Sequence, residues 1–193
     1  MKKGWIALIV AGLVVVIVGG MYVSSRNTMV RKSEAIKSDW AQVDVVLERR
    51  ADLIPNLVAT VKGVAAQEVT VFTAVANARA NLMNARNPKD KIAANQQLDG
   101  AIVKVLALTE NYPQLRSNES FLRLQDELAG TENRIAVERR RYDNAIQDYN
   151  AYIGQFPNSV FAGWARFRRN DAYFAATPAA QQVPKVQFPT ARE

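Results

Sequence analysis

The sequence contains no cysteine and no histidine among its 193 residues. The chain can therefore form no disulfide, no thiolate nucleophile and no histidine-ligated metal site. It also lacks the side chain that most often moves protons near neutral pH. A hydrolase built on carboxylates alone, or a magnesium site built on oxygen ligands alone, stays formally open. Because most catalytic templates are excluded, we expect no enzyme and no cofactor.

A dominant charge of one sign is also absent. There are 25 basic and 18 acidic residues, which gives a net charge of +7. No recognised nucleic-acid-binding motif accompanies the basic residues, so nucleic acid is not an expected partner. A hydrophobic content of 49% is enough for one packed domain and a membrane segment.

Charged residues are missing altogether from residues 4–25. A helix needs about 20 apolar residues to cross the hydrocarbon core, and this stretch is long enough. A cleaved signal peptide is the alternative, but its apolar core would span only about 7–15 residues. We therefore expect an uncleaved anchor, with aromatic rings near both ends. Its representative residues are Trp5, Ile6, Leu8, Val14, Ile17, Tyr22 and Val23.

The body that follows opens with a long heptad pattern. Apolar residues recur at alternating steps of three and four, as in the seam of a coiled coil, for about six heptads. The phase holds on both sides of Pro55, so we expect one kinked helix from Met29 to Arg86, roughly 85 Å long. The seam comprises Trp40, Val43, Leu47, Arg50, Ile54, Leu57, Val61, Val64, Glu68, Val71, Val75, Ala78 and Leu82.

Proline and asparagine signals mark further helices. Asn87-Pro88 begins a second helix, which ends at Tyr112-Pro113. A third helix begins near Ser117 or Asn118, and its apolar residues recur every seven positions from Phe121 to Phe156. A short fourth follows Phe156-Pro157. We therefore predict an all-α fold: an N-terminal transmembrane helix followed by an elongated, antiparallel, coiled-coil-like bundle of about four helices. The expected divisions are 1–25 (anchor), 26–176 (bundle) and 177–193 (an extended or disordered tail).

The predicted helix lengths leave part of the first seam without an obvious partner. The second helix is less than half as long as the first, so it covers only the membrane-distal half. An uncovered apolar seam in water usually marks an interface. We therefore expect a homo-oligomer that assembles through Trp40, Val43, Leu47 and Ile54.

Several polar residues fall in or beside the seams. They are Arg50, Glu68, Thr131, Glu132, Asn133, Arg134 and Glu138. One interpretation is a polar site for a metal or a proton inside the bundle. The other is a pair of polar layers that fix the register between helices, which is the best-attested use of such residues. We favour the second.

A basic group closes the body at Arg166, Arg168 and Arg169. Together with neighbouring aromatic residues it suits contact with anionic lipid. The simpler interpretation is a helix that packs its aromatic side chains into the bundle.

Seven runs of the sequence belong together: Trp40–Lys62, Ala78–Ala80, Glu110–Pro113, Gly130–Ala136, Arg141–Asn144, Tyr149-Asn150 and Phe156-Pro157. Together these runs resemble the LemA family of bacterial membrane-anchored proteins. Two departures are visible, because Gln67 stands where the family has histidine and Tyr142-Asp143 stands where the family tends to have Tyr-Asn. The resemblance covers nearly the whole chain and implies an N-terminal transmembrane helix, an antiparallel helical bundle and no catalytic residues to carry over.

These features favour a membrane-anchored, self-associating scaffold of the bacterial cell envelope. We expect a single span in the inner (cytoplasmic) membrane. Basic residues flank both ends of the span, so the positive-inside rule hardly discriminates. A short N-terminus before a long exported domain favours a body outside the cytoplasm. The alternative function is an adaptor that binds a membrane protease, another envelope protein or anionic lipid through the fourth helix or the tail.

Overall fold

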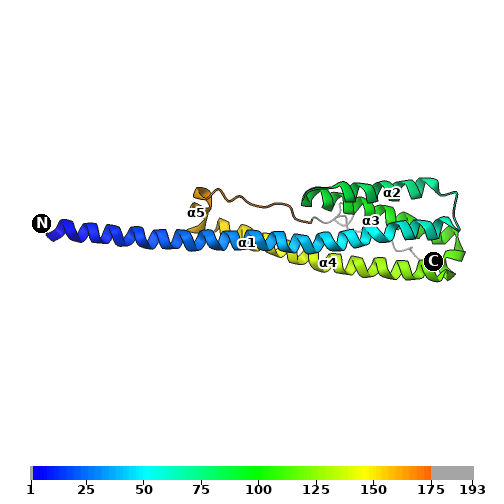
Figure 1. Cartoon of the computed structure of the whole chain (residues 1–193), viewed down its shortest axis with the longest axis horizontal. Helices are drawn as coiled ribbons and strands as arrows, with labels where there is room; N and C mark the ends of the chain where they lie inside the picture. Colours follow the sequence, from blue (N-terminus) through cyan, green and yellow to red (C-terminus); the bar gives the residue numbers. More distant parts are fainter. Residues whose placement is uncertain (1, 175–193) are drawn as a thin grey trace, which may run out of the picture.

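The computed structural model describes residues 2–174, with side chains from Gly4 onward. Within this range the fold is all-α, as predicted, and no strand occurs (Figure 1). The elements are α1 (Lys2–Lys62), α2 (Val69–Asn84), α3 (Pro88–Asn111), the 3-10 helix η1 (Pro113–Ser117), α4 (Glu119–Gly154) and α5 (Asn158–Trp164).

The first helix, α1, joins the apolar N-terminal segment to the body without a loop. It contains 61 residues and is therefore about 90 Å long. Its N-terminal part is long and apolar enough to cross a membrane, with a mean hydropathy of 2.7 over the best window. The expected anchor side chains are exposed, as lipid-facing residues are, except Tyr22, which is half-buried.

The helix continues through Pro55 but ends much earlier than the heptad pattern predicts. The expected helix from Met29 to Arg86 is wrong, because the chain reverses at residues 63–68 and α2 runs back along α1. The fold-back buries the apolar seam of α2, including Val75 and Leu82, which a straight helix would have left in water. The same spacing of three and four residues appears on both sides of the turn because both helices bury one face with the same period.

Pro55 leaves one backbone acceptor of α1 without its usual partner. Proline has no N–H, so the carbonyl of Ala51, four residues earlier, cannot accept the normal helical bond. Arg79 of α2 takes that place: its Nε donates to the Ala51 carbonyl oxygen at 2.8 Å. The fold-back of α2 therefore also satisfies the polar group that Pro55 exposes.

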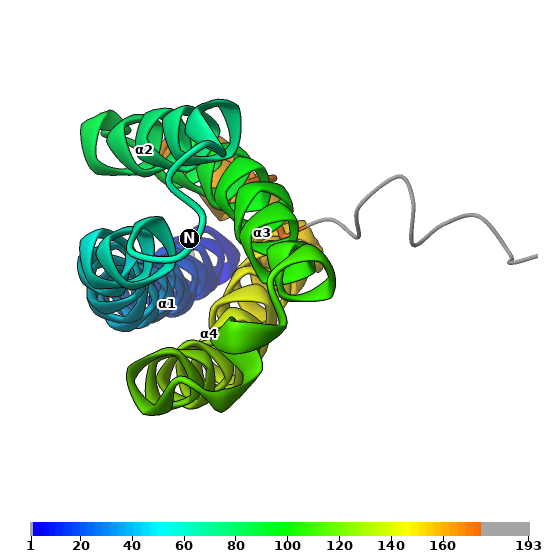
Figure 2. The ribbon, with the colours of Figure 1, turned by 90° about the vertical axis from the view of Figure 1, so that its right-hand side faces the viewer.

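Each of the helices α2, α3 and α4 runs antiparallel to the α-helix before it in the chain. Figure 1 shows the α2–α3 hairpin beside the distal half of α1, and α4 alongside α1 back toward the membrane end. Seen along the bundle, α1 lies between α2 and α4 (Figure 2). Two asparagines cap the starts of helices, as predicted: Asn87 accepts from the Asp90 N–H at 2.9 Å, and Asn118 accepts from the Phe121 N–H at 3.0 Å.

The expectation that the Trp40–Ile54 seam lacks an intrachain partner is wrong. Val43, Leu47 and Ile54 are buried inside the chain, and the Trp40 ring lies 5.1 Å from that of Tyr142. The covering element is α4, whose 36 residues extend about 54 Å. The next helix in the chain is too short to cover this seam, but a helix distant in sequence can lie against it. Since α4 supplies the missing partner, the seam is not an available surface.

The chain returns along the bundle after α5. Residues 165–174, which we call the strap, run from α5 back toward the distal end (Figure 1). The predicted tail at 177–193 lies outside the described residues.

Candidate functional site

A partly buried polar layer connects three helices in the distal half of the bundle. Arg50 of α1 is only 5% exposed, although its seam position suits an apolar residue. Its Nη1 lies 2.8 Å from Oε2 of Glu132 on α4, donates to Oδ1 of Asn95 on α3 at 3.3 Å, and pairs with Asp99. Asn95 Nδ2 donates to Asp99 Oδ2 at 3.3 Å. We call these four residues the Arg50 layer.

The charges of the Arg50 layer are unequal, with two carboxylates around one guanidinium. Burial raises the pKa of Asp99 above its ordinary value of 3.8, and the charge of Glu132 adds to this, while Arg50 and the more distant Arg139 oppose it. Asp99 is therefore a weaker acid than an exposed aspartate.

The chemistry of the Arg50 layer fits the fixing of helix register. A guanidinium only donates hydrogen bonds, and it already occupies the space between the two carboxylates. Across residues 2–174 no group of three or more acidic side chains is placed to hold a metal ion. An arginine that must meet partners on α3 and α4 penalises any sliding of these helices along α1.

The other residues expected in polar layers are scattered. Glu68 lies at the turn before α2 and accepts from the Tyr112 hydroxyl at 2.9 Å. Thr131 is buried but bonds only its own helix, at the Leu128 carbonyl. Glu138 pairs with Arg141 one turn along α4 at 3.0 Å.

The inclusion of Asn133 and Arg134 in a polar layer is wrong, because both side chains are exposed on the outside of α4. They follow Glu132 in sequence, but successive helical residues point in directions about 100° apart. Asn95 and Asp99 of the layer were missed. They lie at helical spacing between Ile92 and Ile102, so they interrupt the apolar face of α3 with polar side chains. That interruption could have identified them as members of a polar layer from the sequence.

A second polar arrangement holds the strap against α4. The amide of Asn150 donates to the Asn170 carbonyl at 2.7 Å and accepts from its N–H at 2.9 Å. Tyr149 donates to the Arg168 carbonyl at 2.9 Å. These bonds replace regular secondary structure for the strap, whose backbone groups would otherwise lie unpaired beside the bundle.

The strap ends in an aromatic cluster. The ring of Phe174 lies 6.1 Å from that of Tyr142 and 6.3 Å from that of Trp40. The Arg139 guanidinium lies 4.6 Å above the Phe174 ring, a cation–π arrangement. The Phe174 N–H donates to Asp143 at 3.1 Å. Burial raises the pKa of Asp143, while this bond and Arg139 oppose the rise.

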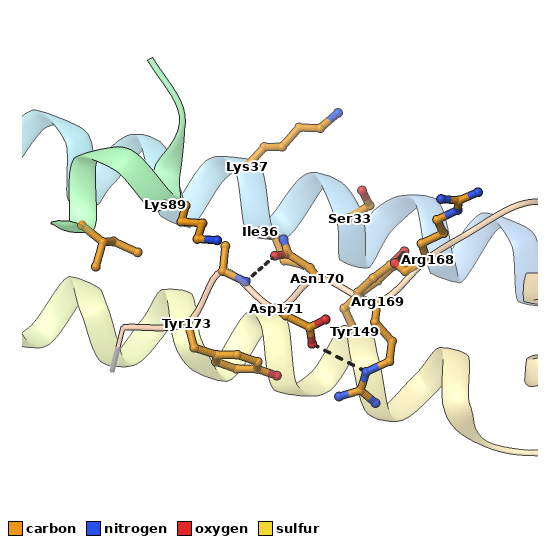
Figure 3. Close-up of a pocket in the computed structure, with 12 residues that line it drawn as sticks. Ser33, Ile36, Lys37, Lys89, Tyr149, Arg168, Arg169, Asn170, Asp171 and Tyr173 are labelled. Atoms are coloured by element: carbon orange, nitrogen blue, oxygen red, sulfur yellow. Dashed lines mark hydrogen bonds and ion pairs between the residues drawn. The ribbon is translucent and has the colours of Figure 1, made fainter. Parts of the chain in front are cut away.

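A groove of about 600 Å³ lies between the strap, α1 and the start of α3 (Figure 3). Lys37, Lys89, Arg168 and Arg169 contribute cationic side chains to it. Two of them are compensated within the chain: Arg169 lies 3.7 Å from Asp171, and Lys37 lies 2.7 Å from Glu34.

The expected arginine group is therefore divided. Arg168 and Arg169 line this groove, whereas Arg166 is not among its lining residues and lies two residues after the end of α5.

Comparison with known proteins identifies relatives over most of the chain. The model of the LemA family matches residues 39–188. Magnetosome proteins MamQ 1 and MamQ 2 of Paramagnetospirillum magneticum are each 27% identical to the chain over 179 residues. Magnetosome protein MamQ of Magnetospirillum gryphiswaldense is 25% identical over the same length. In each case the match covers 79% of this chain and 65% of the relative, so the chain spans about two thirds of the length of these proteins.

Proposed function

The chain belongs to the LemA family, and we propose that it is a non-enzymatic scaffold anchored in a bacterial membrane. The observation that carries the proposal is the uninterrupted α1, which makes the span and the bundle one continuous element. From Tyr22 to Lys62 this helix rises about 60 Å. Paired with α4, it holds the α2–α3 hairpin at a set distance from the bilayer.

Two further observations support a scaffold over an enzyme. The sequence has neither histidine nor cysteine. The most deeply buried charged residue, Arg50, is engaged with side chains of two other helices. The relatives that we found are named magnetosome proteins. These names associate the relatives with the magnetosome, and we propose by extension that this chain also serves a cellular assembly.

Self-association of the scaffold must use surfaces other than the seam. Val45 on α1 and Val103 on α3 are large apolar side chains that remain exposed on the body. The direct test is the mass of the detergent-extracted full-length protein, measured by light scattering. A discrete oligomer that Val45→Arg dissociates, while Val103→Arg does not, would assign the contact to the outer face of α1. A monomer at all concentrations would refute self-association.

The second candidate function is an adaptor that binds an acidic segment of another envelope protein. The basic groove beside the strap favours it, because Lys89 and Arg168 have no acidic partner among the ion pairs of residues 2–174. Capture of a partner from solubilised membranes should fail for Lys89→Glu and for Arg168→Glu, because both residues line the groove. It should survive Lys104→Glu, a control on α3 outside this groove. Self-assembly should survive all three changes.

We further propose that the chain is a single-pass protein of the cytoplasmic membrane with its bundle on the extracytoplasmic side. The absence of cysteine makes a clean test possible. Ser120 is exposed at the start of α4, in the distal end of the bundle. A Ser120→Cys variant should react with a membrane-impermeant maleimide in intact cells. Labelling that needs permeabilised cells would place the bundle in the cytoplasm.

A further inference from the structure

The junction between the span and the bundle exposes an apolar surface that the bundle does not use. Phe156 is 85% exposed, although its heptad position predicts a buried side chain. Trp164 is 67% exposed and Val160 is 42% exposed, and these two lie four residues apart on one face of α5. The opposite face of α5 is buried through Phe161 and Ala162.

This apolar surface is fixed to α1 at the end of the span. The Ser25 hydroxyl, which is buried, donates to Oδ1 of Asn158 at 2.8 Å. The Tyr22 ring contacts Phe161 edge-on at 5.7 Å and lies 6.3 Å from the Trp164 ring. Figure 1 shows α5 beside α1 at the membrane-proximal end of the body.

Trp164 also reaches toward residues deeper in the span. It lines an apolar hollow of about 500 Å³ together with Val14, Val15, Val18, Gly19 and Tyr22. Along the helix axis, Val18 lies about 6 Å and Val14 about 12 Å below Tyr22. If the Tyr22 ring marks the headgroup level, the hollow opens into the hydrocarbon, where an acyl chain and not water fills it.

The end of α5 places positive charge beside this apolar surface. Arg166 adopts φ 60°, the left-handed conformation that favours glycine. The Arg166 N–H donates to the Gly163 carbonyl at 3.3 Å and the Phe167 N–H to the Ala162 carbonyl at 3.0 Å, which is the hydrogen-bond pattern of a Schellman cap. An exposed arginine thus occupies a backbone position where glycine would be less strained. On α1, exposed Arg26 follows the span directly.

We propose that Phe156, α5 and Arg166 form a foot that rests in the bilayer as a second membrane contact. Phe156, Val160 and Trp164 contact acyl chains of the leaflet nearest the bundle, and Arg166 contacts anionic phospholipid headgroups. The foot therefore fixes the angle of the bundle relative to the membrane. The inference rests on the membrane-anchored state in the proposed function, but not on scaffolding or self-association.

The three tryptophans of the chain allow a direct test. Trp5→Phe with Trp40→Phe leaves Trp164 as the sole probe, and Trp5→Phe with Trp164→Phe leaves Trp40 as a matched control. Trp40 lies about 27 Å beyond Tyr22 along α1. Each full-length variant is reconstituted into vesicles of phosphatidylcholine and phosphatidylglycerol in which the acyl chains carry bromine near the headgroup.

We expect brominated lipid to lower Trp164 fluorescence at least twofold and to leave Trp40 fluorescence unchanged. Aqueous iodide should quench Trp164 less than it quenches free tryptophan. Trp164 that is quenched by iodide but not by brominated lipid would overturn the foot. Trp164 shielded from both quenchers would also overturn it, because another copy of the chain would then cover this surface.

Contact between Arg166 and anionic headgroups can be tested separately. Arg166→Gly keeps the cap geometry and removes the charge. In the Trp164-only chain, quenching should increase when phosphatidylglycerol is added to phosphatidylcholine vesicles, and Arg166→Gly should reduce that increase at least twofold. An undiminished increase would refute headgroup contact by this residue.

Discussion

Replacing Arg50 by methionine tests the role of the Arg50 layer. Methionine preserves most of the apolar stem but leaves Asp99 and Glu132 facing each other without the shared guanidinium. Breaking a fully buried ion pair costs about 3–5 kcal/mol. The side chains of Asp99 and Glu132 retain 37% and 48% exposure, so water screens the charges left behind. We therefore expect Arg50→Met to lower the free energy of unfolding by about 2 kcal/mol.

This loss is measurable by thermal unfolding of the full-length protein in detergent, followed by circular dichroism. For a chain of this size it corresponds to a fall in Tm of about 4–8 °C. Arg49→Met is the matched control, because Arg49 is the adjacent residue and is exposed. Its effect should stay within about 0.5 kcal/mol. Adding Asp99→Asn to Arg50→Met should recover most of the loss, since it removes the repulsion between the carboxylates.

The loss should also depend on pH. Burial, as the largest cause, raises the folded-state pKa of Asp99 above its ordinary value of 3.8. Stability linked to its protonation is therefore fully present below pH 3.8 and is lost as pH rises through the folded pKa. Arg50 opposes the rise, so removing Arg50 raises that pKa further. The difference in free energy of unfolding between wild type and Arg50→Met should therefore become smaller as pH falls from 7 toward 4. Equal losses for Arg49→Met and Arg50→Met, or a loss independent of pH, would refute the assigned role.

Three further predictions concern single contacts. Arg79→Met should lower the free energy of unfolding by about 1.5–3 kcal/mol, because the Ala51 carbonyl loses its donor. The loss should be smaller in a Pro55→Ala background, where the backbone N–H of residue 55 can donate to that carbonyl instead, and equal losses in both backgrounds would contradict the pairing. Tyr142→Phe should leave the free energy of unfolding unchanged or raise it, because its buried hydroxyl has no hydrogen-bond partner within residues 2–174. Tyr149→Phe should lower the free energy of unfolding by about 1 kcal/mol, and the opposite order of stability in thermal melts would contradict this. Asn150→Ala should release the strap and speed trypsin cleavage at the arginines of the strap. An unchanged cleavage rate would show that the hydrogen bonds between Asn150 and Asn170 do not hold the strap against α4.

The anchor and the helices were predictable because their signals are local. An uncharged run long enough to cross a bilayer defines the span, and asparagine caps mark the starts of α3 and α4. Burial of one helix face repeats every three to four residues whatever the partner is. The heptad pattern therefore identified Val43, Leu47 and Ile54 as seam residues and Arg50 as an anomaly within the seam.

The sequence by itself determined which faces are apolar, but not which helix covers them. The same period serves an oligomer seam, a straight helix or a helix that folds back, so the heptads left open both the reversal after Lys62 and the pairing with α4. Only the tertiary structure decided that α4 buries the α1 seam, that Asn95 and Asp99 complete the Arg50 layer, and that Phe156 leaves the bundle at the membrane boundary. Each of these depends on packing between residues far apart in the chain, and local spacing does not encode packing of that kind.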